Sequence, residues 1–263
     1  MEPSFRLFTS LRYDPALTAA HNNPVLAHAG WNFRNPSPCY MLDLHRDRML
    51  RAARHWGWDK AVRVLSGDEG LQTLGRLAEE ELKGDGPARV RVFVNEKGEL
   101  RLDRAPERER NLGELFPARL APPGEEEGEG PTWEVVLDDA GTDKSEFTHY
   151  KTTKREMYNL ARERKGIQLG QLKEVLITGP DGVVMEGSIT TPYFWREGRW
   201  VTPRVGATIG DEGCGGQDGT TRRWALESGL AVEGVVEARQ LVDGELVWLS
   251  NGAKGFIKGR FQA

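Results

Sequence analysis

The stretch HYKTTKREMYNLARER, residues 149–164, is the segment from which we predict the fold. Thr153 and Glu156 have the spacing of a capping box, in which two side chains accept hydrogen bonds from amides at a helix start. The expected helix has one apolar stripe that ends in an arginine, and its members are Met157, Leu160, Ala161 and Arg164. The pattern therefore predicts a loop that enters a helix, with Lys151 two residues before the cap.

Lys151 is a candidate nucleophile because the loop is extended there and the side chain can turn into a cleft. Removing a lysine from water disfavours its charged form, which lowers the pKa and frees the amine to attack a carbonyl carbon. The alternative is that Lys151 is one of many solvated lysines. The downstream sequence favours the first interpretation.

Composition excludes several classes of protein. The 263 residues include 40 acidic and 36 basic side chains, which gives a net charge of −4 with no basic field for nucleic acid. Cys39 and Cys214 are far apart and match no zinc spacing, so we expect no metal site. No apolar run approaches the length of a membrane span and no leader pattern is present, so we expect a cytoplasmic protein in a reducing setting.

The chain is predicted to form two domains of α+β or α/β class. Residues 1–117 combine an alternating strand, two helices and a hairpin into a small α+β domain. Residues 118–131, which are rich in proline, glycine and glutamate, cannot bury themselves and are expected to be a linker. Residues 132–263 are dominated by strands and are predicted to be the larger, cofactor-binding domain. The strands expected in it are residues 133–137, 174–178, 183–185, 193–195, 199–202, 232–236 and 245–249.

Two features of the second part would suit a phosphorylated pyridine cofactor. Glu186 follows a strand, and its carboxylate can keep a ring nitrogen protonated, although a solvent-facing strand residue is the alternative. In the run Gly219-Thr220-Thr221, a glycine-rich loop opens a helix, where free amides, hydroxyls and the helix dipole favour a phosphate. A simple threonine cap is the alternative there.

The ordered set of these motifs resembles the class IV pyridoxal-phosphate enzymes, which include branched-chain and D-amino-acid aminotransferases and aminodeoxychorismate lyase. The resemblance rests on Lys-Thr-Thr-Lys-Arg from Lys151, Glu-Gly-Ser-Ile-Thr from Glu186, Gly-Thr-Thr-Arg from Gly219 and Ser-Asn-Gly from Ser250. It implies a two-domain fold type IV enzyme with pyridoxal 5'-phosphate in its site, and a homodimer. Lys151 would form the Schiff base, and the other implied cofactor residues are Arg51, Glu186, Ser188, Ile189, Thr190, Gly219, Thr220 and Thr221.

The segment Phe-Thr-Ser-Leu-Arg, residues 8–12, resembles the lyases more than the branched-chain aminotransferases. The implied reaction converts 4-amino-4-deoxychorismate to 4-aminobenzoate and pyruvate, a step of folate biosynthesis. Lys151 and Ser10 are the expected catalytic residues, and the expected substrate residues are Thr9, Arg12, Arg155, Ser250, Asn251 and Gly252. A class IV aminotransferase is the alternative, and a non-catalytic relative is disfavoured because Lys151 and Glu186 are both present.

Overall fold

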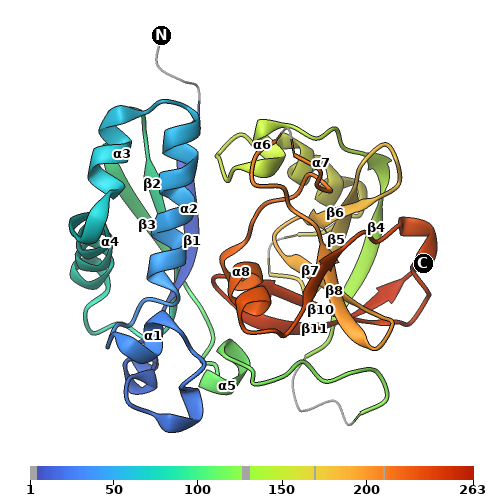
Figure 1. Ribbon diagram of the computed structural model, residues 1–263, viewed down its shortest axis with the longest axis horizontal. Coiled ribbons are helices and arrows are strands. Elements are labelled where there is room, and N and C mark those ends of the chain that lie inside the picture. Colours follow the sequence, from blue (N-terminus) through green and yellow to red (C-terminus); the bar gives the residue numbers. More distant parts are fainter. Residues whose placement is uncertain (1–4, 126–130, 169, 210) are drawn as a thin grey trace. The chain divides into compact units, whose positions relative to one another are not determined.

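The computed structural model describes residues 5–125, 131–168, 170–209 and 211–263 (Figure 1). The chain forms two compact units. The first comprises the chain up to Phe116 with the segments Tyr150–Lys154 and Gly252–Gly255, and the second comprises Pro117–His149, Arg155–Asn251 and Phe256–Ala263.

This division differs from the predicted one in two segments. The sequence assigned Lys151 and Gly252 to the second domain, but both belong to the first unit. The reason is hydrogen bonding to one strand, because Phe8 N donates to Lys151 O (3.1 Å) and Arg12 N donates to Gly252 O (2.8 Å). Part of the predicted linker, residues 126–130, lies outside the described residues.

The first unit is built on a three-stranded antiparallel sheet in the order β1-β2-β3. Its strands are β1 (Leu7–Tyr13), β2 (Ala88–Val94) and β3 (Leu100–Pro106). Burial alternates along β2, since Val90, Val92 and Val94 are buried and the residues between them are partly exposed. Gly98 in the β2–β3 turn has φ +78°, which glycine adopts at little cost, as the sequence predicts.

Helices supply the rest of the first unit's core. They are α1 (Trp31–Arg34), α2 (Leu42–His55), α3 (Asp59–Leu65), α4 (Gly67–Leu82) and α5 (Leu112–Leu115). Figure 1 shows α2, α3 and α4 beside the strands, and Leu42, Met49, Leu65 and Leu74 join the valines of β2 in one core. Helices α2 and α4 were predicted, whereas α3 was not.

The second unit is built on an eight-stranded mixed sheet with the order β6-β5-β4-β11-β10-β7-β8-β9. Its strands are β4 (Trp133–Gly141), β5 (Lys173–Thr178), β6 (Val184–Gly187), β7 (Thr191–Arg196), β8 (Arg199–Pro203), β9 (Val232–Gly234), β10 (Leu246–Asn251) and β11 (Gly255–Gln262). Strand β5 is buried on both faces, because Val175 and Ile177 pack into one core cluster and Leu176 into another. The strand-dominated prediction is confirmed, although β11 was not predicted.

The described residues of the second unit also form the helices α6 (Glu146–His149), α7 (Glu156–Arg164) and α8 (Thr220–Glu227) and the short 3-10 helix Ala238–Gln240. The capping box predicted for α7 is wrong, because Arg155 is the cap residue and no side chain caps the helix. Thr153 instead pairs with the residue before β1, accepting from Arg6 N on Oγ1 (3.0 Å) and donating its own amide to Arg6 O (2.9 Å). In the described part of the chain, no helix has the length and apolar character needed to cross a membrane.

The predicted apolar stripe of α7 is confirmed for Ala161, which is buried, and for Met157, which packs against the same core cluster, but it is wrong for Leu160. Tyr158 and Ala161 are the buried residues of this helix, whereas Leu160 is 50% exposed. The tyrosine turns inward and donates a hydrogen bond to the buried carboxylate of Glu186 in the second unit.

Candidate active site

The segment that carries Lys151 runs along the edge of β1. Leu7 and Thr152 form an antiparallel bridge, and Phe8 N donates to Lys151 O (3.1 Å). The ammonium of Lys151 lies 5.0 Å from the centroid of the Phe8 ring. A cation over an aromatic face is attracted by the ring quadrupole. This contact holds the amine on the side of β1 that carries Phe8.

Three polar groups meet on the opposite side of β1, against α2. Arg48 donates to Thr9 Oγ1 (2.5 Å), which is also 2.6 Å from Nδ1 of His45. Thr9 and His45 are fully buried. Burial lowers the pKa of His45 well below its usual value, and the positive charges of Arg48 and Lys151 lower it further. His45 is therefore neutral, and Thr9 is engaged here and does not lie on the Ser10 side of the strand.

Arg51, the predicted phosphate residue, is not part of this group. Its Nε lies 3.3 Å from Asp47 on the same helix, and its side chain is 37% exposed. Arg48 contacts β1, because it lies about one turn after His45 on the same face of α2. The sequence interpretation assigned the phosphate to Arg51, and these contacts make Arg48 a second candidate on the same helix.

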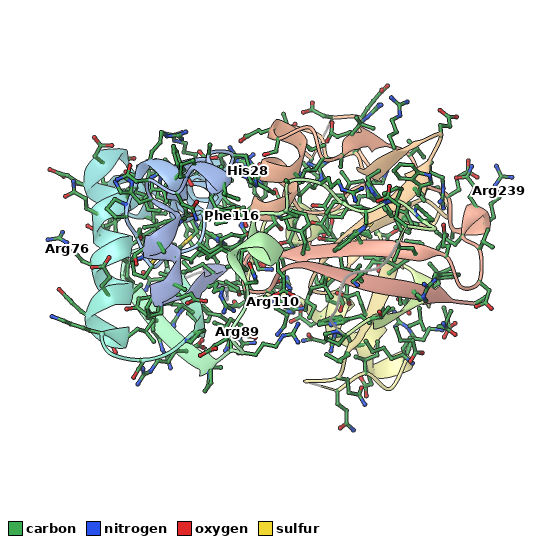
Figure 2. The ribbon with its side chains drawn as sticks, turned by 90° about the horizontal axis from the view of Figure 1, so that it is seen from below. His28, Arg76, Arg89, Arg110, Phe116 and Arg239 are labelled. Atoms are coloured by element: carbon green, nitrogen blue, oxygen red, sulfur yellow. The ribbon has the colours of Figure 1, made fainter. Side chains whose placement is uncertain are left out.

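The Ser10 side of the sheet is rich in arginine. Ser10 is paired with Arg91, and Arg12 with Arg89, across the β1–β2 ladder. Arg12 is fully buried, donates to Asp14 (2.6 and 2.8 Å) and to Arg108 O (2.8 Å), and keeps one buried nitrogen, Nη1, without a partner. Arg89, labelled in Figure 2, also has a buried nitrogen without a partner, Nε.

Arg91 shares this face with two stacked aromatic rings. It donates to both carboxylate oxygens of Asp103 (2.6 and 2.8 Å) and lies 5.5 Å from the Phe93 ring centroid. The rings of Phe8 and Phe93 stack with their centroids 5.5 Å apart. The face thus combines flat apolar surface with guanidinium donors, which suits a ring that bears carboxylates.

Gly252 is the one residue of the predicted Ser-Asn-Gly run that the structure assigns to the first unit. A Cβ at this position would lie 2.4 Å from the His45 ring and 2.8 Å from Ser10 O. Only glycine allows the chain to pass so close, and its carbonyl accepts from Arg12 N. Gly252 therefore supports β1 through its backbone.

Glu186 lies at the centre of the second unit's candidate site, opposite Ile177 in the β5–β6 ladder and only 8% exposed. Tyr158 donates a hydrogen bond to its carboxylate, and Gln217 Nε2 donates to the Tyr158 oxygen (3.2 Å). Gly216 permits this arrangement, since a Cβ there would lie 2.6 Å from Met185 O. The sequence pattern did not predict Tyr158 or Gln217, because both contacts join segments distant in the chain.

The hydroxyls of Ser188 and Thr190 were predicted to bind cofactor, but both donate to the buried carboxylate of Glu174, at 2.5 and 2.7 Å. The carbonyl of Ile189 accepts from Asn251 Nδ2 (3.3 Å). Arg155 lies nearby, donating to Ser188 O (3.0 Å), and burial lowers its pKa while neighbouring acids act in the opposite direction. Ser188, Ile189 and Thr190 thus form one turn, whose side-chain hydroxyls face Glu174 and whose carbonyls accept from Arg155 and Asn251.

The predicted phosphate site is a helix start backed by a chain of hydroxyls. Gly219 caps α8, and Thr220 and Thr221 are its first two residues, each about 1% exposed. Ser250 Oγ is 2.8 Å from both the Tyr193 hydroxyl and Thr221 Oγ1. Ser250 is therefore buried behind the helix start. The first amides of a helix have no partner within it, and they favour an anion.

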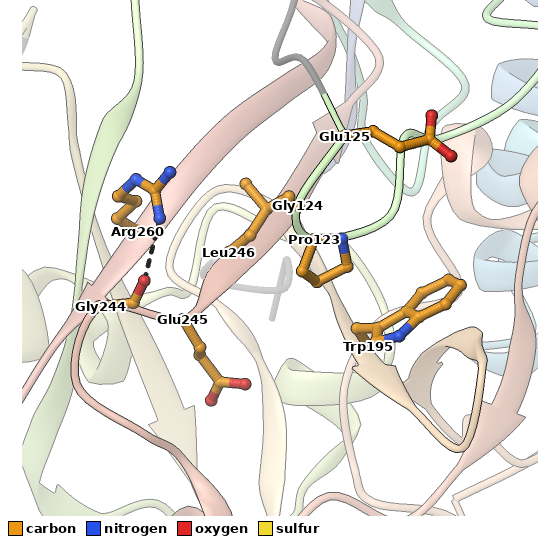
Figure 3. Close-up of a pocket in the computed structure, with 8 residues that line it drawn as sticks. All are labelled: Pro123, Gly124, Glu125, Trp195, Gly244, Glu245, Leu246 and Arg260. Atoms are coloured by element: carbon orange, nitrogen blue, oxygen red, sulfur yellow. Dashed lines mark hydrogen bonds between the residues drawn. The ribbon is translucent and has the colours of Figure 1, made fainter.

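A separate cavity of about 430 Å³ in the second unit is lined by Pro123, Gly124, Glu125, Trp195, Gly244, Glu245, Leu246 and Arg260 (Figure 3). Arg260 donates to Gly244 O across it (3.1 Å). It contains none of the predicted site residues. Within the described part of the chain, no cluster of His, Cys, Asp and Glu side chains could hold a metal ion.

Comparison with known proteins identifies the family. Residues 30–260 match the family model described as amino-transferase class IV. The aminodeoxychorismate lyase of Saccharomyces cerevisiae is 34% identical over 143 residues, which are 48% of this chain and 36% of the yeast enzyme. A Schizosaccharomyces pombe relative is 25% identical over 225 residues, 84% of this chain and 83% of its own length.

Solved structures share the fold. The fold IV-transaminase of Curtobacterium pusillum superposes with a TM-score of 0.60 at 14% identity, and the match covers 98% of this chain and 79% of that one. The two-unit architecture is thus that of fold type IV. Because the family model spans most of the chain, this protein belongs to the class IV aminotransferase family and is one of its enzymes.

Proposed function

We propose that the protein is a pyridoxal-phosphate-dependent aminodeoxychorismate lyase, which converts 4-amino-4-deoxychorismate to 4-aminobenzoate and pyruvate. The observation that carries the choice is the face of β1 and β2 on which Ser10 lies opposite Arg91, with Arg89 two residues away on the same strand. The substrate is a ring with two carboxylates. An arginine-lined face suits it better than it suits the apolar side chain of a branched-chain amino acid.

The residues of the two units fit the chemical groups of the cofactor. In the second unit, the amides at the start of α8 suit its phosphate and the hydrogen-bonded carboxylate of Glu186 suits its pyridine nitrogen. In the first unit, taken by itself, the guanidinium of Arg48 is a donor that suits an anion. When bound, pyridoxal phosphate supplies an aldehyde that condenses with amines and a ring that withdraws electrons. Lys151 supplies the amine for the resting enzyme.

The protein's own residues then have separate tasks. Nζ of Lys151 removes the proton from the substrate carbon that bears the amino group, and later delivers it to the departing enolpyruvyl carbon. The Glu186 carboxylate holds the proton on the ring nitrogen, and Tyr158 orients that carboxylate. The Ser10 hydroxyl lies on the same face as Phe8, over which the Lys151 ammonium is held.

Two experiments test the proposal. Borohydride reduction after addition of pyridoxal phosphate is expected to attach the cofactor to Lys151, to leave Lys151→Ala unlabelled, and to label Lys154→Ala normally. Label on another lysine, or no uptake at all, would remove the cofactor assignment. The protein is then incubated with 4-amino-4-deoxychorismate and, separately, with amino-acid donors plus 2-oxoacids. Turnover of the second mixture alone would make the protein an aminotransferase.

We also infer a homodimer in the cytoplasm, on the basis of the family resemblance and of the composition. Light scattering on the purified protein tests the first statement, since a monomeric mass at working concentration contradicts it. Fractionation of the producing cells tests the second.

A further inference from the structure

Glu174 is a buried acid whose environment calls for an explanation. It lies near the start of the inner strand β5 and has no exposed surface. Its carboxylate accepts five hydrogen bonds, from Val175 N (2.9 Å), Ser188 N (3.1 Å), Ser188 Oγ (2.5 Å), Ile189 N (3.2 Å) and Thr190 Oγ1 (2.7 Å). The guanidinium of Arg162 lies near it, with Nη1 3.8 Å from Oε1. Burial of a carboxylate is costly unless such donors surround it.

Four of the five donors belong to one short turn, Ser188–Thr190, which joins β6 to β7. The chain wraps closely around the carboxylate, because a Cβ at Gly187 would lie 3.0 Å from both Cδ and Oε2 of Glu174. The Gly187 amide donates to Thr190 O (2.8 Å), which closes the turn. A Cβ at Gly187 would also lie 2.5 Å from Thr190 Oγ1, so the turn that closes around the acid leaves no room for a side chain here.

The turn is fixed on its inner side by Glu174 and so presents its other groups outward. The carbonyl of Ser188 accepts from Arg155 (3.0 Å), and that of Ile189 accepts from Asn251 (3.3 Å). Glu186 immediately precedes Gly187, so its backbone position depends on how the turn is held. A displacement of even about 1 Å in a site of this kind lowers rates substantially.

We propose that Glu174 is the positioning residue of this enzyme: its buried carboxylate holds the turn 187–190 and thereby sets Glu186 and Ile189 for the pyridine ring. The inference rests on the proposed cofactor but concerns a residue that does not touch it. The amide of Glu174→Gln brings two N–H groups to one end of the side chain. Either end already faces a backbone amide, so at least one buried N–H loses its acceptor.

The test compares Glu174→Gln with Asp138→Asn. Asp138 is a matched control, because it is also buried and accepts from Arg164 through both oxygens (2.5 and 2.8 Å) but lies outside the turn. Pyridoxal phosphate is titrated into the apo proteins, and the absorption spectrum of the bound cofactor is recorded between pH 6 and 9. Glu174→Gln is expected to weaken cofactor binding about tenfold or more and to shift the pH dependence of the spectrum, whereas Asp138→Asn keeps both.

The outcomes separate the two proposals. Wild-type protein that binds no pyridoxal phosphate overturns the proposed function, and this inference with it. Wild-type binding with an unchanged affinity and spectrum in Glu174→Gln overturns the positioning role alone. If circular dichroism shows that Glu174→Gln does not fold, Ser188→Ala with Thr190→Val removes two donors and leaves the acid. That double variant is expected to weaken binding severalfold and to shift the spectrum, and wild-type values in it contradict the proposal.

Discussion

The Tyr158 phenol donates a hydrogen bond to the Glu186 carboxylate, and both side chains are buried within the second unit. Burial raises the pKa of Tyr158 well above its usual value, and the charge of Glu186 raises it further. The phenol therefore stays protonated and remains a donor over the whole working pH range. Gln217 donates to the phenol oxygen from behind, so the carboxylate is held by a chain of two residues.

Tyr158→Phe removes only the hydroxyl of this chain. We expect kcat to fall about tenfold or more, since a hydrogen bond to a charged group contributes about 1.5–3 kcal/mol, while KM changes less than threefold. Tyr40→Phe is the control, because it loses an equally buried phenol that donates to Leu115 O (2.5 Å) in the first unit. An unchanged kcat in Tyr158→Phe, measured by steady-state kinetics, would show that Glu186 needs no such partner.

We expect replacement of Arg48 and replacement of Arg51 to have different effects on the affinity for pyridoxal phosphate. Arg48→Ala should weaken binding of pyridoxal phosphate by about tenfold or more, because a charge-assisted contact to the phosphate is lost. Arg51→Ala should change it less than twofold, since its partly exposed pair with Asp47 contributes about 0–1 kcal/mol. Fluorescence titration of the two apo proteins decides between them, and the reverse order of affinities restores the original assignment to Arg51.

His45 makes the stability of the protein depend on pH. Because its folded pKa is lowered well below 6.5, mainly by burial, the unfolded chain binds a proton below about pH 6.5 that the folded chain does not. Stability from this group is present above that pH and is lost as the pH falls, by up to about 1.4 kcal/mol per pH unit. Thermal unfolding from pH 7.5 to 5 should show a smaller decline in His45→Gln than in wild type.

The control for this prediction is His21→Gln, whose ring is only half-buried and whose Nδ1 is 2.9 Å from Phe33 O. It should keep the wild-type decline. Equal pH dependence in the His45 and His21 variants means that other groups determine the loss of stability in acid.

Local patterns predicted much of the fold, and tertiary pairing explains the failures. Residues 88–94 and 100–103 were predicted as a hairpin around Gly98, and the structure agrees, because β2 alternates buried and partly exposed residues and Gly98 has a positive φ. The capping box at Thr153 failed since the same residue can pair with a strand, and Arg6 offered both an amide and a carbonyl. Strand β11 was not predicted; it lies in the sheet between β10, which precedes it directly in the chain, and its parallel partner β4.

The sequence predicted which motifs belong to the candidate site, but it did not predict which side chains contact one another there. Lys151 and Glu186 follow from residue type and order, yet Arg48 and Arg51 differ by three residues on one helix and only the packing of α2 on β1 separates them. Glu174 resembled an ordinary strand residue, because its partners follow 14 to 16 positions later. The spacing of residues in the sequence does not predict hydrogen bonds of this kind, which form only when the two segments pack together.

The arginines of the Ser10 face provide the sharpest test of the substrate. If this face binds the carboxylates of 4-amino-4-deoxychorismate, Arg89→Leu and Arg91→Leu should each raise KM about tenfold or more, while kcat and cofactor affinity change less than threefold. Arg76→Leu is the control, because Arg76 is exposed on α4 (Figure 2).

Comparing the KM of Arg91→Leu with that of Asp103→Asn shows whether Arg91 binds the substrate through its charge or only packs on this face. Arg91→Leu leaves Asp103 without its bidentate partner, so part of its effect is repulsion of the substrate by an uncompensated carboxylate. Asp103→Asn removes that carboxylate and frees the guanidinium, and it should leave KM unchanged or lower it. The KM of wild type should also rise with ionic strength, because salt screens the attraction. A KM that responds to neither arginine nor to salt would assign the carboxylates to another part of the protein and weaken the case for the lyase.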